Sequence, residues 1–150
     1  MKQVKISTGC FALVDDEDFD RLSKISWTVR VKHLESKNGR TKTIYMPRLI
    51  MNAPKGMQVD HINGNTLDNR KSNLRICTGS QNIRNRGPKP GKYKGVYLRK
   101  DRIKKRWRAR IEIDKKRIEL GHFTTAEEAA IVYNKAAEKY HKEFAYINKL

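Results

Sequence analysis

The chain has 150 residues, a formal net charge of +18 and an isoelectric point near 10.1. A charge of this size does not fix a fold, but it points to a polyanionic partner, either nucleic acid or a membrane surface. The mean hydropathy is −0.82, and the sequence has no apolar run of the roughly 18 residues that a membrane span needs. The composition therefore favours nucleic acid over a membrane.

The cysteines and the first residues indicate the cellular location that we expect. The opening segment, MKQVKISTGC, lacks the apolar stretch of a signal peptide, so we expect a cytoplasmic location. Cys10 and Cys77 form no CxxC pair and cannot supply a four-thiolate zinc site. We interpret both as free, reduced thiols.

The first 58 residues are predicted to form a small mixed α/β segment. Acids at the start of its helix suit the helix dipole, with Asp15 or Asp16 as the cap. Pro47 is acceptable only in the first turn of a helix. In chain order we expect strands at 2–6 and 11–14, a helix at 15–23, a hairpin of strands 27–32 and 41–45 with its turn at 36–39, and a helical turn at 46–51.

The segment from Val59 to Asn85 has an unusual composition. It holds six asparagines, three arginines and the adjacent pair Asp60-His61. Asparagine is a poor former of helices and strands. We therefore expect these side chains to serve in ligation, hydrogen bonding and tight turns, although each asparagine taken alone would suit an ordinary Asx-turn.

The spacing within this segment predicts a ββα unit. A strand ends at His61, a turn-rich loop follows, a second strand lies near 74–76, and a helix starts near Thr78 or Ser80. This arrangement brings the first strand and the helix together around one point. Asp60 and Asn82 then offer two oxygen ligands, which hard cations such as Mg²⁺ prefer.

Two further residues suit a hydrolytic site. His61 lies beside the predicted ligands and can activate water as a general base, because the pKa of histidine is normally close to neutral pH. Asn73, twelve positions after His61, can hold the imidazole in the required tautomer.

The last part of the chain is predicted to be a three-stranded sheet with one helix. Residues 87–91, GPKPG, have linker composition and mark a domain boundary. Thr125 and Glu128 form a capping box at the helix start. Strands are expected at 95–99, 107–113 and 117–123, a turn at 114–116, and a helix with one apolar stripe of Ala126, Ala129, Ala130, Tyr133, Ala136, Ala137 and Tyr140.

Alternation in this sheet predicts one covered and one open face. Trp107, Ala109, Ile111 and Ile113 point one way and would be covered by the helix, and the arginine-rich face stays open. Between residues 69 and 111 the sole acid is at position 101, while Lys and Arg recur with aromatic residues among them. This pattern favours nucleic acid over an ordinary solvated face.

The central motif carries a resemblance. DHINGN, LDNR, NLR and QN, at these spacings over Val59 to Asn85, resemble the HNH endonuclease family, in particular the homing endonucleases of phages and introns. FALVDDEDF and YMPRLIMNAPKGM upstream are also typical of these proteins, which makes residues 1–86 one nuclease module. The resemblance implies a ββα-metal core at 59–86. It also implies that the protein acts in a bacterial or phage-infected cell.

The same resemblance implies the roles of individual residues. Asp60 and Asn82 would bind one divalent metal ion, Mg²⁺ or Mn²⁺; His61 would be the general base; and Asn73 would orient His61. Two positions depart from the usual pattern. Asn82 stands where many members have histidine, a variant known in the homing branch, and Pro47 stands where similar sequences usually have histidine.

Residues 93–148 carry a second resemblance, through YKGV, WRARIEI and RIELGHFTTAEEAAIVYNKAAEKYHKEFAYIN. They are similar to the plant ethylene-response-factor DNA-binding domain, which lays a three-stranded sheet in the DNA major groove. Four of the contact positions differ from the usual plant residues, namely Tyr97, Arg110, Glu112 and Glu119. The implied DNA contacts are Lys94, Tyr97, Arg99, Arg110, Glu112, Arg117 and Glu119, to which strand alternation adds Arg108.

Together these features predict an α+β protein in three parts: an HNH nuclease module (1–86), a linker (87–92) and a DNA-binding domain (93–150) whose three-stranded antiparallel sheet packs on one helix. We expect a site-directed, metal-dependent endonuclease acting on double-stranded DNA, with no membrane and no protein partner. One active site per chain favours nicking by a monomer. The alternatives are a non-catalytic DNA-binding regulator and, with less support because Tyr97 is the sole ring on the open face, an RNA-binding module.

Overall fold

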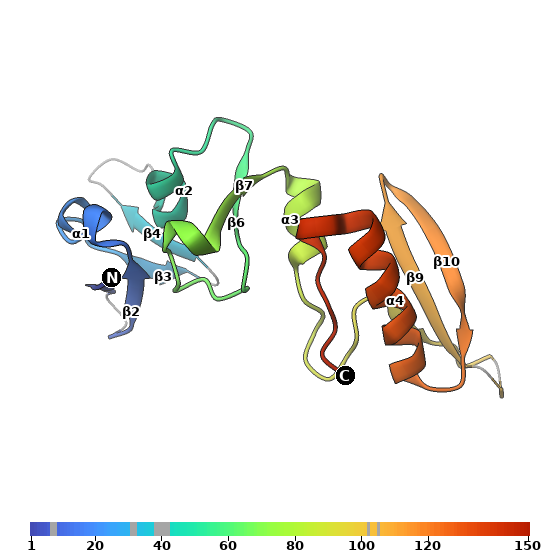
Figure 1. Cartoon of the computed structure of the whole chain (residues 1–150). Helices are drawn as coiled ribbons and strands as arrows, with labels where there is room; N and C mark the ends of the chain where they lie inside the picture. The colour runs from blue at the N-terminus through green and yellow to red at the C-terminus, as the bar shows by residue number, and fades with distance from the viewer. Residues whose placement is uncertain (7–8, 31–32, 38–42, 102, 105) are drawn as a thin grey trace. The chain divides into compact units, whose positions relative to one another are not determined.

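The computed structural model describes residues 1–6, 9–30, 33–37, 43–101, 103–104 and 106–150 (Figure 1). Contacts divide the chain into two compact units, residues 1–82 and 83–150. Both are mixed α/β, built on small antiparallel sheets. No helix in the described ranges has the length and apolar character needed to cross a membrane.

The first unit holds three small antiparallel sheets. Strands β1 and β2 pair with each other, β3–β4–β5 form a meander, and β6 pairs with β7. Its elements are β1 (Lys2–Lys5), β2 (Phe11–Val14), α1 (Asp16–Leu22), β3 (Thr28–Arg30), β4 (His33–Lys37), β5 (Thr43–Tyr45), α2 (Met46–Met51), β6 (Gln58–His61), the 3-10 turn η1 (Lys71–Asn73), β7 (Leu74–Cys77) and most of α3 (Gly79–Asn85).

One hydrophobic core joins the first strands to the segment from Val59 to Asn85. Trp27 is fully buried and donates its indole N–H to the carbonyl of Leu22 at 2.8 Å. Leu74, at the start of β7, packs into the same cluster of buried side chains. Leu13 of β2 exchanges backbone hydrogen bonds with Leu67 and Asn69, both at 2.8 Å. The loop between β6 and β7 is therefore held against β2.

Two expectations for this unit need correction. The hairpin of 27–32 with 41–45 is wrong, because β4 lies between the two strands and pairs with both. Ser36 and Lys37 are part of β4 rather than of a turn, and residues 38 and 39 lie outside the described ranges. Asp15 is the N-cap residue of α1, but its side chain makes no capping bond there and accepts from the Lys71 backbone N–H at 2.8 Å instead.

The second unit is a three-stranded antiparallel sheet with a helix on one face. Figure 1 shows α4 running along the sheet. Ile111 packs with Tyr133, Ala136 and Ala137 in its core. The unit comprises the end of α3 followed by β8 (Val96–Leu98), β9 (Trp107–Ile113), β10 (Lys116–Phe123), α4 (Ala126–His141) and the 3-10 turn η2 (Lys142–Phe144).

Most of the second unit follows its sequence pattern. The capping box is formed: Glu128 N–H donates to Thr125 Oγ1 at 3.1 Å, and the Glu128 carboxylate accepts from the Thr125 N–H. The helical stripe is wrong at its end, because Tyr140 is 41% exposed and His141 is buried in its place. Burial lowers the pKa of His141, whose Nε2 lies 2.9 Å from the carbonyl oxygen of Glu112.

Asn148 links the last residues of the second unit to the rest of that unit by hydrogen bonds. It is buried, and its side chain accepts from the Lys94 N–H at 2.7 Å and donates to the Lys94 carbonyl at 3.1 Å. Its own backbone exchanges hydrogen bonds with the Asn134 side chain on α4. The end of the chain is thereby tied to both the helix and the strand entry.

Candidate active site and nucleic-acid interface

The β6–β7 hairpin carries residues of the first candidate site. Its register places Asp60 opposite Arg75 and His61 opposite Leu74. Side chains alternate along a strand, so Gln58 and Asp60 share one face of β6, and His61 belongs to the other. Asp60 and His61 are both buried, with exposed fractions of 6% and 7%.

Asp60 forms an ion pair with Arg75 across the hairpin. Arg75 donates from Nε at 2.9 Å and from Nη2 at 2.7 Å, and both bonds go to the same oxygen, Oδ2. The buried thiol of Cys77 lies near this pair: burial raises its pKa, and the Asp60 charge raises it further. One face of the hairpin thus gathers a carboxylate, its guanidinium partner and a thiol that stays protonated.

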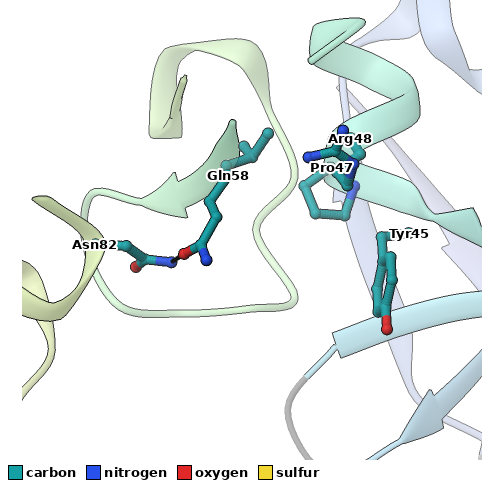
Figure 2. Close-up of a pocket in the computed structure, with 6 residues that line it drawn as sticks. Tyr45, Pro47, Arg48, Gln58 and Asn82 are labelled. Atoms are coloured by element: carbon teal, nitrogen blue, oxygen red, sulfur yellow. Dashed lines mark hydrogen bonds between the residues drawn. The ribbon is translucent and has the colours of Figure 1, made fainter. Parts of the chain in front are cut away.

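Helix α3 brings Asn82 to the same face. The Asn82 amide nitrogen donates to Gln58 Oε1 at 2.8 Å, as Figure 2 shows. Gln58 lies two residues before Asp60 on β6, so the contact puts Asn82 on the Asp60 side of the hairpin. The helix starts at Gly79, where the Thr78 and Gln81 side chains bond to each other's backbone N–H groups.

The donor set fits a hard divalent cation. Asp60 contributes a carboxylate, and Asn82 contributes an amide oxygen whose companion nitrogen is already bonded to Gln58. Oxygen donors of this kind, completed by water and substrate phosphate, suit Mg²⁺. In the described ranges no cluster of three or more His, Cys, Asp and Glu residues that could hold a metal ion is present.

His61 meets Asn69 rather than Asn73. Its Nε2 lies 3.1 Å from Asn69 Oδ1, and Asn69 is completely buried. The Asn69 amide nitrogen donates to the Thr66 carbonyl at 3.2 Å, which fixes Oδ1 as the acceptor on the imidazole side. An imidazole that donates to Asn69 Oδ1 carries a proton on Nε2.

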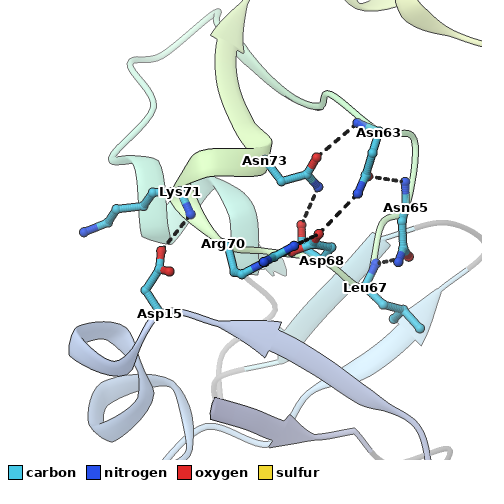
Figure 3. Close-up of polar contacts among 8 residues, drawn as sticks. All are labelled: Asp15, Asn63, Asn65, Leu67, Asp68, Arg70, Lys71 and Asn73. Carbon is cyan, nitrogen blue, oxygen red and sulfur yellow. Dashed lines mark hydrogen bonds and ion pairs between the residues drawn. The ribbon is translucent and has the colours of Figure 1, made fainter. Parts of the chain in front are cut away.

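Asn73 holds the loop that follows His61. Its Oδ1 accepts from the Asn63 N–H at 3.0 Å, and its Nδ2 donates to the Asp68 carbonyl at 2.8 Å (Figure 3). Its carbonyl also accepts from the Ile62 N–H at 2.9 Å, directly beside His61. We expected a direct bond from Asn73 to the imidazole; Asn69 makes that contact, and any orienting role of Asn73 stays a prediction that would act through the loop.

A second ion pair stiffens the same loop. Arg70 donates from Nε and Nη2 to the two oxygens of Asp68 at 2.7 and 2.6 Å. These bonds lower the pKa of the Asp68 carboxyl, which also accepts from Asn63. Asp68 is buried, so the charge pair is shielded from water on the carboxylate side. The loop is held by side chains as well as by its turns.

A pocket of about 260 Å³ adjoins Asn82 in the first unit (Figure 2). Arg48 in its wall is anchored, because it donates to the carbonyls of Met57, Ala53 and Pro54. Pro47 lies in the first turn of α2, as its chemistry requires. The pocket is lined by Tyr45, Pro47, Arg48, Gln58, Val59 and Asn82.

The open face of the sheet in the second unit is the candidate DNA interface. The Tyr97 ring is 49% exposed, and the guanidinium carbons of Arg108 and Arg110 each lie 5.8 Å from its centre. The strand register places Tyr97 beside Arg108 and Arg110 beside Glu119. The predicted alternation of β9 is therefore confirmed, with arginine and tyrosine side chains sharing one face.

Carboxylates balance several of the arginines on this face. Arg108 lies 3.8 Å from Glu119, and Arg117 lies 3.4 Å from Glu112. Arg99 is paired with both oxygens of Asp101. These cations are thus held in place by exposed acids.

Lys94 does not lie on that face. Its ammonium donates to the carbonyls of Ile83, Arg84 and Arg86 at the end of α3. Burial, and then the charge of Arg86, lower its pKa to about 8. As a DNA contact Lys94 stays a prediction, and the contacts found for it are those of a helix C-cap.

Comparisons with known proteins find a family profile and a related protein that match this sequence. The profile of the HNH endonuclease family matches residues 52–84, which hold β6, β7 and most of α3. Over 147 residues the chain is 31% identical to a protein of Acanthamoeba polyphaga mimivirus named uncharacterized HNH endonuclease L560, covering 95% of this chain and 76% of the viral protein. The chain belongs to the HNH endonuclease family. No solved structure matches it significantly.

The HNH profile does not cover the sheet and the helix α4 of the second unit. It ends at residue 84, and the resemblance of residues 93–148 to the plant domain stays a prediction. The predicted bounds 1–86, 87–92 and 93–150 likewise stay predictions. By contacts the second unit starts at Ile83, and Gly87 lies close to the Tyr146 ring.

Sequence reasoning missed three residues of this HNH site. Arg75 is the ion-pair partner of Asp60, and Asn69 contacts His61. Gln58 accepts a hydrogen bond from the Asn82 amide. Gln58 could have been found, because it lies two positions before Asp60 on a predicted strand. Arg75 required the register of the hairpin, and nothing in the sequence separates Asn69 from its neighbouring asparagines.

Proposed function

We propose that this HNH protein is a site-directed, divalent-metal-dependent endonuclease of the homing type that hydrolyses phosphodiester bonds in double-stranded DNA. The observation that carries the proposal is the placing of Asp60 and Asn82 on one face of the β6–β7–α3 unit, with His61 next in sequence. Membership of the HNH family supports nuclease activity on DNA.

Asp60 and Asn82 would hold the metal ion, Mg²⁺ or Mn²⁺, through one carboxylate and one amide oxygen. When bound, the ion supplies positive charge that stabilises the phosphorane-like transition state and the departing 3′ oxygen. Gln58 fixes the Asn82 amide by accepting from its nitrogen, so the amide oxygen is the atom presented as a ligand.

His61 would act as the general base. With Nε2 directed at the Asn69 oxygen, Nδ1 takes a proton from water, and the resulting hydroxide attacks phosphorus in line with the leaving oxygen. Asn73 would keep the loop after His61 in place through Asn63 and Asp68. The family resemblance implies products with 5′-phosphate and 3′-hydroxyl ends.

The second unit would locate the DNA site. Its open face combines an exposed ring with several arginines, as in proteins that contact the DNA backbone and guanine edges. The proposed contacts are Tyr97, Arg99, Arg108, Arg110, Glu112, Arg117 and Glu119, with Lys94 as the family resemblance implies. Residues 87–92 would join this unit to the nuclease module, and one active site per chain favours nicking by a monomer.

A supercoiled-plasmid assay tests this function. The plasmid carries DNA from the source genome and is incubated with the full chain and Mg²⁺ or Mn²⁺, with EDTA as the control. Metal-dependent open circles are expected, whereas linear product would indicate paired cuts. An intact plasmid together with a clear gel shift would favour the rival function, a DNA-binding protein without catalysis that uses the sheet of the second unit.

A further inference from the structure

The ion pair of Asp60 and Arg75 joins a forked guanidinium to a buried carboxylate. Arg75 donates from Nε and from Nη2 to one oxygen of Asp60, Oδ2. The Asp60 side chain is 7% exposed and the Arg75 side chain 16% exposed. The guanidinium is therefore the counter-charge of a nearly dry carboxylate, which without one would be costly to bury.

A divalent cation at Asp60 would meet this guanidinium. The hairpin register keeps the Arg75 backbone directly opposite Asp60, so its guanidinium stays within reach of the carboxylate. Two cations beside one carboxylate repel each other, and this repulsion is strong where water is largely excluded. Arg75 and a metal ion are thus competitors for the same charge.

We propose that Arg75 is an exchangeable counter-ion, which neutralises Asp60 in the metal-free protein and gives up Oδ2 when the divalent ion binds. This inference rests on the proposed function, because it takes Asp60 as a metal ligand. Arg75 is then a positioning residue: it keeps a buried metal ligand charged and in place before the metal arrives. The same interaction lowers the affinity for metal.

The first unit contains a matched pair for comparison. Arg70 and Asp68 also join a forked guanidinium to a buried carboxylate, with side-chain exposures of 35% and 4%. Their bonds of 2.7 and 2.6 Å are as short as those of Arg75, but they end on both oxygens and serve the loop. Asp68 is not a proposed ligand, so loss of Arg70 should affect the loop without affecting metal affinity.

The test is Mn²⁺ binding to the full chain without DNA, measured by titration calorimetry and by the shift in melting temperature. In Arg75→Gln we expect the dissociation constant for Mn²⁺ to fall about tenfold, because the variant lacks the nearby positive charge that repels the metal ion. The metal-free variant should melt earlier than wild type, and Mn²⁺ should raise its melting temperature by more than it does for wild type. Arg70→Gln should melt earlier but keep the wild-type dissociation constant.

Two further variants keep the inference falsifiable. Arg75→Lys retains the charge without the fork, and we expect it to bind Mn²⁺ more tightly than wild type but less tightly than Arg75→Gln. It supplies the comparison with wild type if Arg75→Gln does not fold. Asp60→Asn should abolish the Mn²⁺ response. If wild type binds Mn²⁺ and neither Arg75 variant binds it more tightly, the counter-ion role is wrong while the nuclease proposal stands. If wild type and Asp60→Asn are equally unresponsive, the metal site itself is wrong, and both proposals fall.

Discussion

The side chain of Asn69 contacts the imidazole of His61, with Oδ1 lying 3.1 Å from Nε2. Asn69 is itself held by the Thr66 carbonyl and by a backbone bond to Leu13 of β2. The proposed base is therefore fixed from a strand near the start of the chain, well before the HNH motif in sequence. This explains physically why the first strands and the motif belong to one folded unit.

Asn69→Ala should lower the rate of DNA cleavage about 10- to 100-fold, the usual effect of removing the partner that orients a catalytic histidine or ligand. DNA affinity should stay at the wild-type level, because the residue is buried. Single-turnover cleavage and a gel shift measure the two effects. Asn65→Ala, an exposed asparagine of the same loop, is the control and should retain most of the activity. Equal losses in both variants would contradict a specific role of Asn69.

Gly95→Ala should destabilise the second unit by about 3 kcal/mol, because overpacking adds to backbone strain. An added Cβ would lie 2.0 Å from the Tyr133 ring, and the residue has a φ of +74°. Gly91 is the matched control, with a φ of +71° and nothing within 4 Å of an added Cβ. Gly91→Ala should cost about 1 kcal/mol from the backbone alone. Urea unfolding followed by tryptophan fluorescence compares the two, and similar costs would show that Tyr133 does not pack as described.

Lys94→Met should destabilise the second unit by about 2 kcal/mol, since it leaves the carbonyls of Ile83, Arg84 and Arg86 without this donor. Lys92→Met, an exposed neighbour, should change stability by less than about 0.5 kcal/mol. Urea titrations at a fixed neutral pH provide the comparison. A loss in Lys92→Met as large as in Lys94→Met would rule out the capping role.

The same residue predicts a pH dependence. The pKa of Lys94 is lowered from 10.5 to about 8, so below pH 8 both folded and unfolded chains hold its proton. Between pH 8 and the normal pKa of 10.5 only the unfolded chain holds the proton, and the free energy of unfolding therefore increases as the pH rises. The wild type should show this gain relative to Lys94→Met when unfolding is measured from pH 7 to 10. A difference between the two that stays constant over this range would contradict the lowered pKa.

Arg110→Ala should weaken DNA binding about tenfold, as expected for loss of one arginine contact to a base or phosphate. Lys139→Ala removes the same charge from the exposed side of α4 and is the control. Fluorescence anisotropy with a labelled duplex, at one salt concentration, measures both. Equal weakening by the two variants would show that net charge, rather than the open sheet face, attracts DNA.

The sequence predicted the elements that carry strong periodicity. Strand β9 was expected at its observed bounds, β6 was expected to end at His61, and α4 was expected to start after Thr125, because alternation and capping are local properties. Strand β4 was missed, because its sequence HLESK has no apolar alternation. Its pairing with both neighbours is a tertiary property that local patterns do not encode.

The candidate site divides in the same way. Asp60, His61, Asn73 and Asn82 were selected by residue type and spacing, and their roles stay predictions. Arg75 became visible only with the register of the hairpin, since a one-residue shift would send its side chain to the other face. Lys94 was placed on the DNA face by resemblance, but its ammonium lies against the end of α3.

The central claim is that His61 is the base of a metal-dependent DNA endonuclease. The most direct test is a side-by-side measurement of wild type and His61→Ala, with single-turnover plasmid cleavage in Mn²⁺ and a gel shift on the same DNA. We predict that His61→Ala binds DNA like wild type and cleaves at least about 100-fold more slowly, the scale of general-base catalysis. Cleavage by His61→Ala at the wild-type rate would contradict the account.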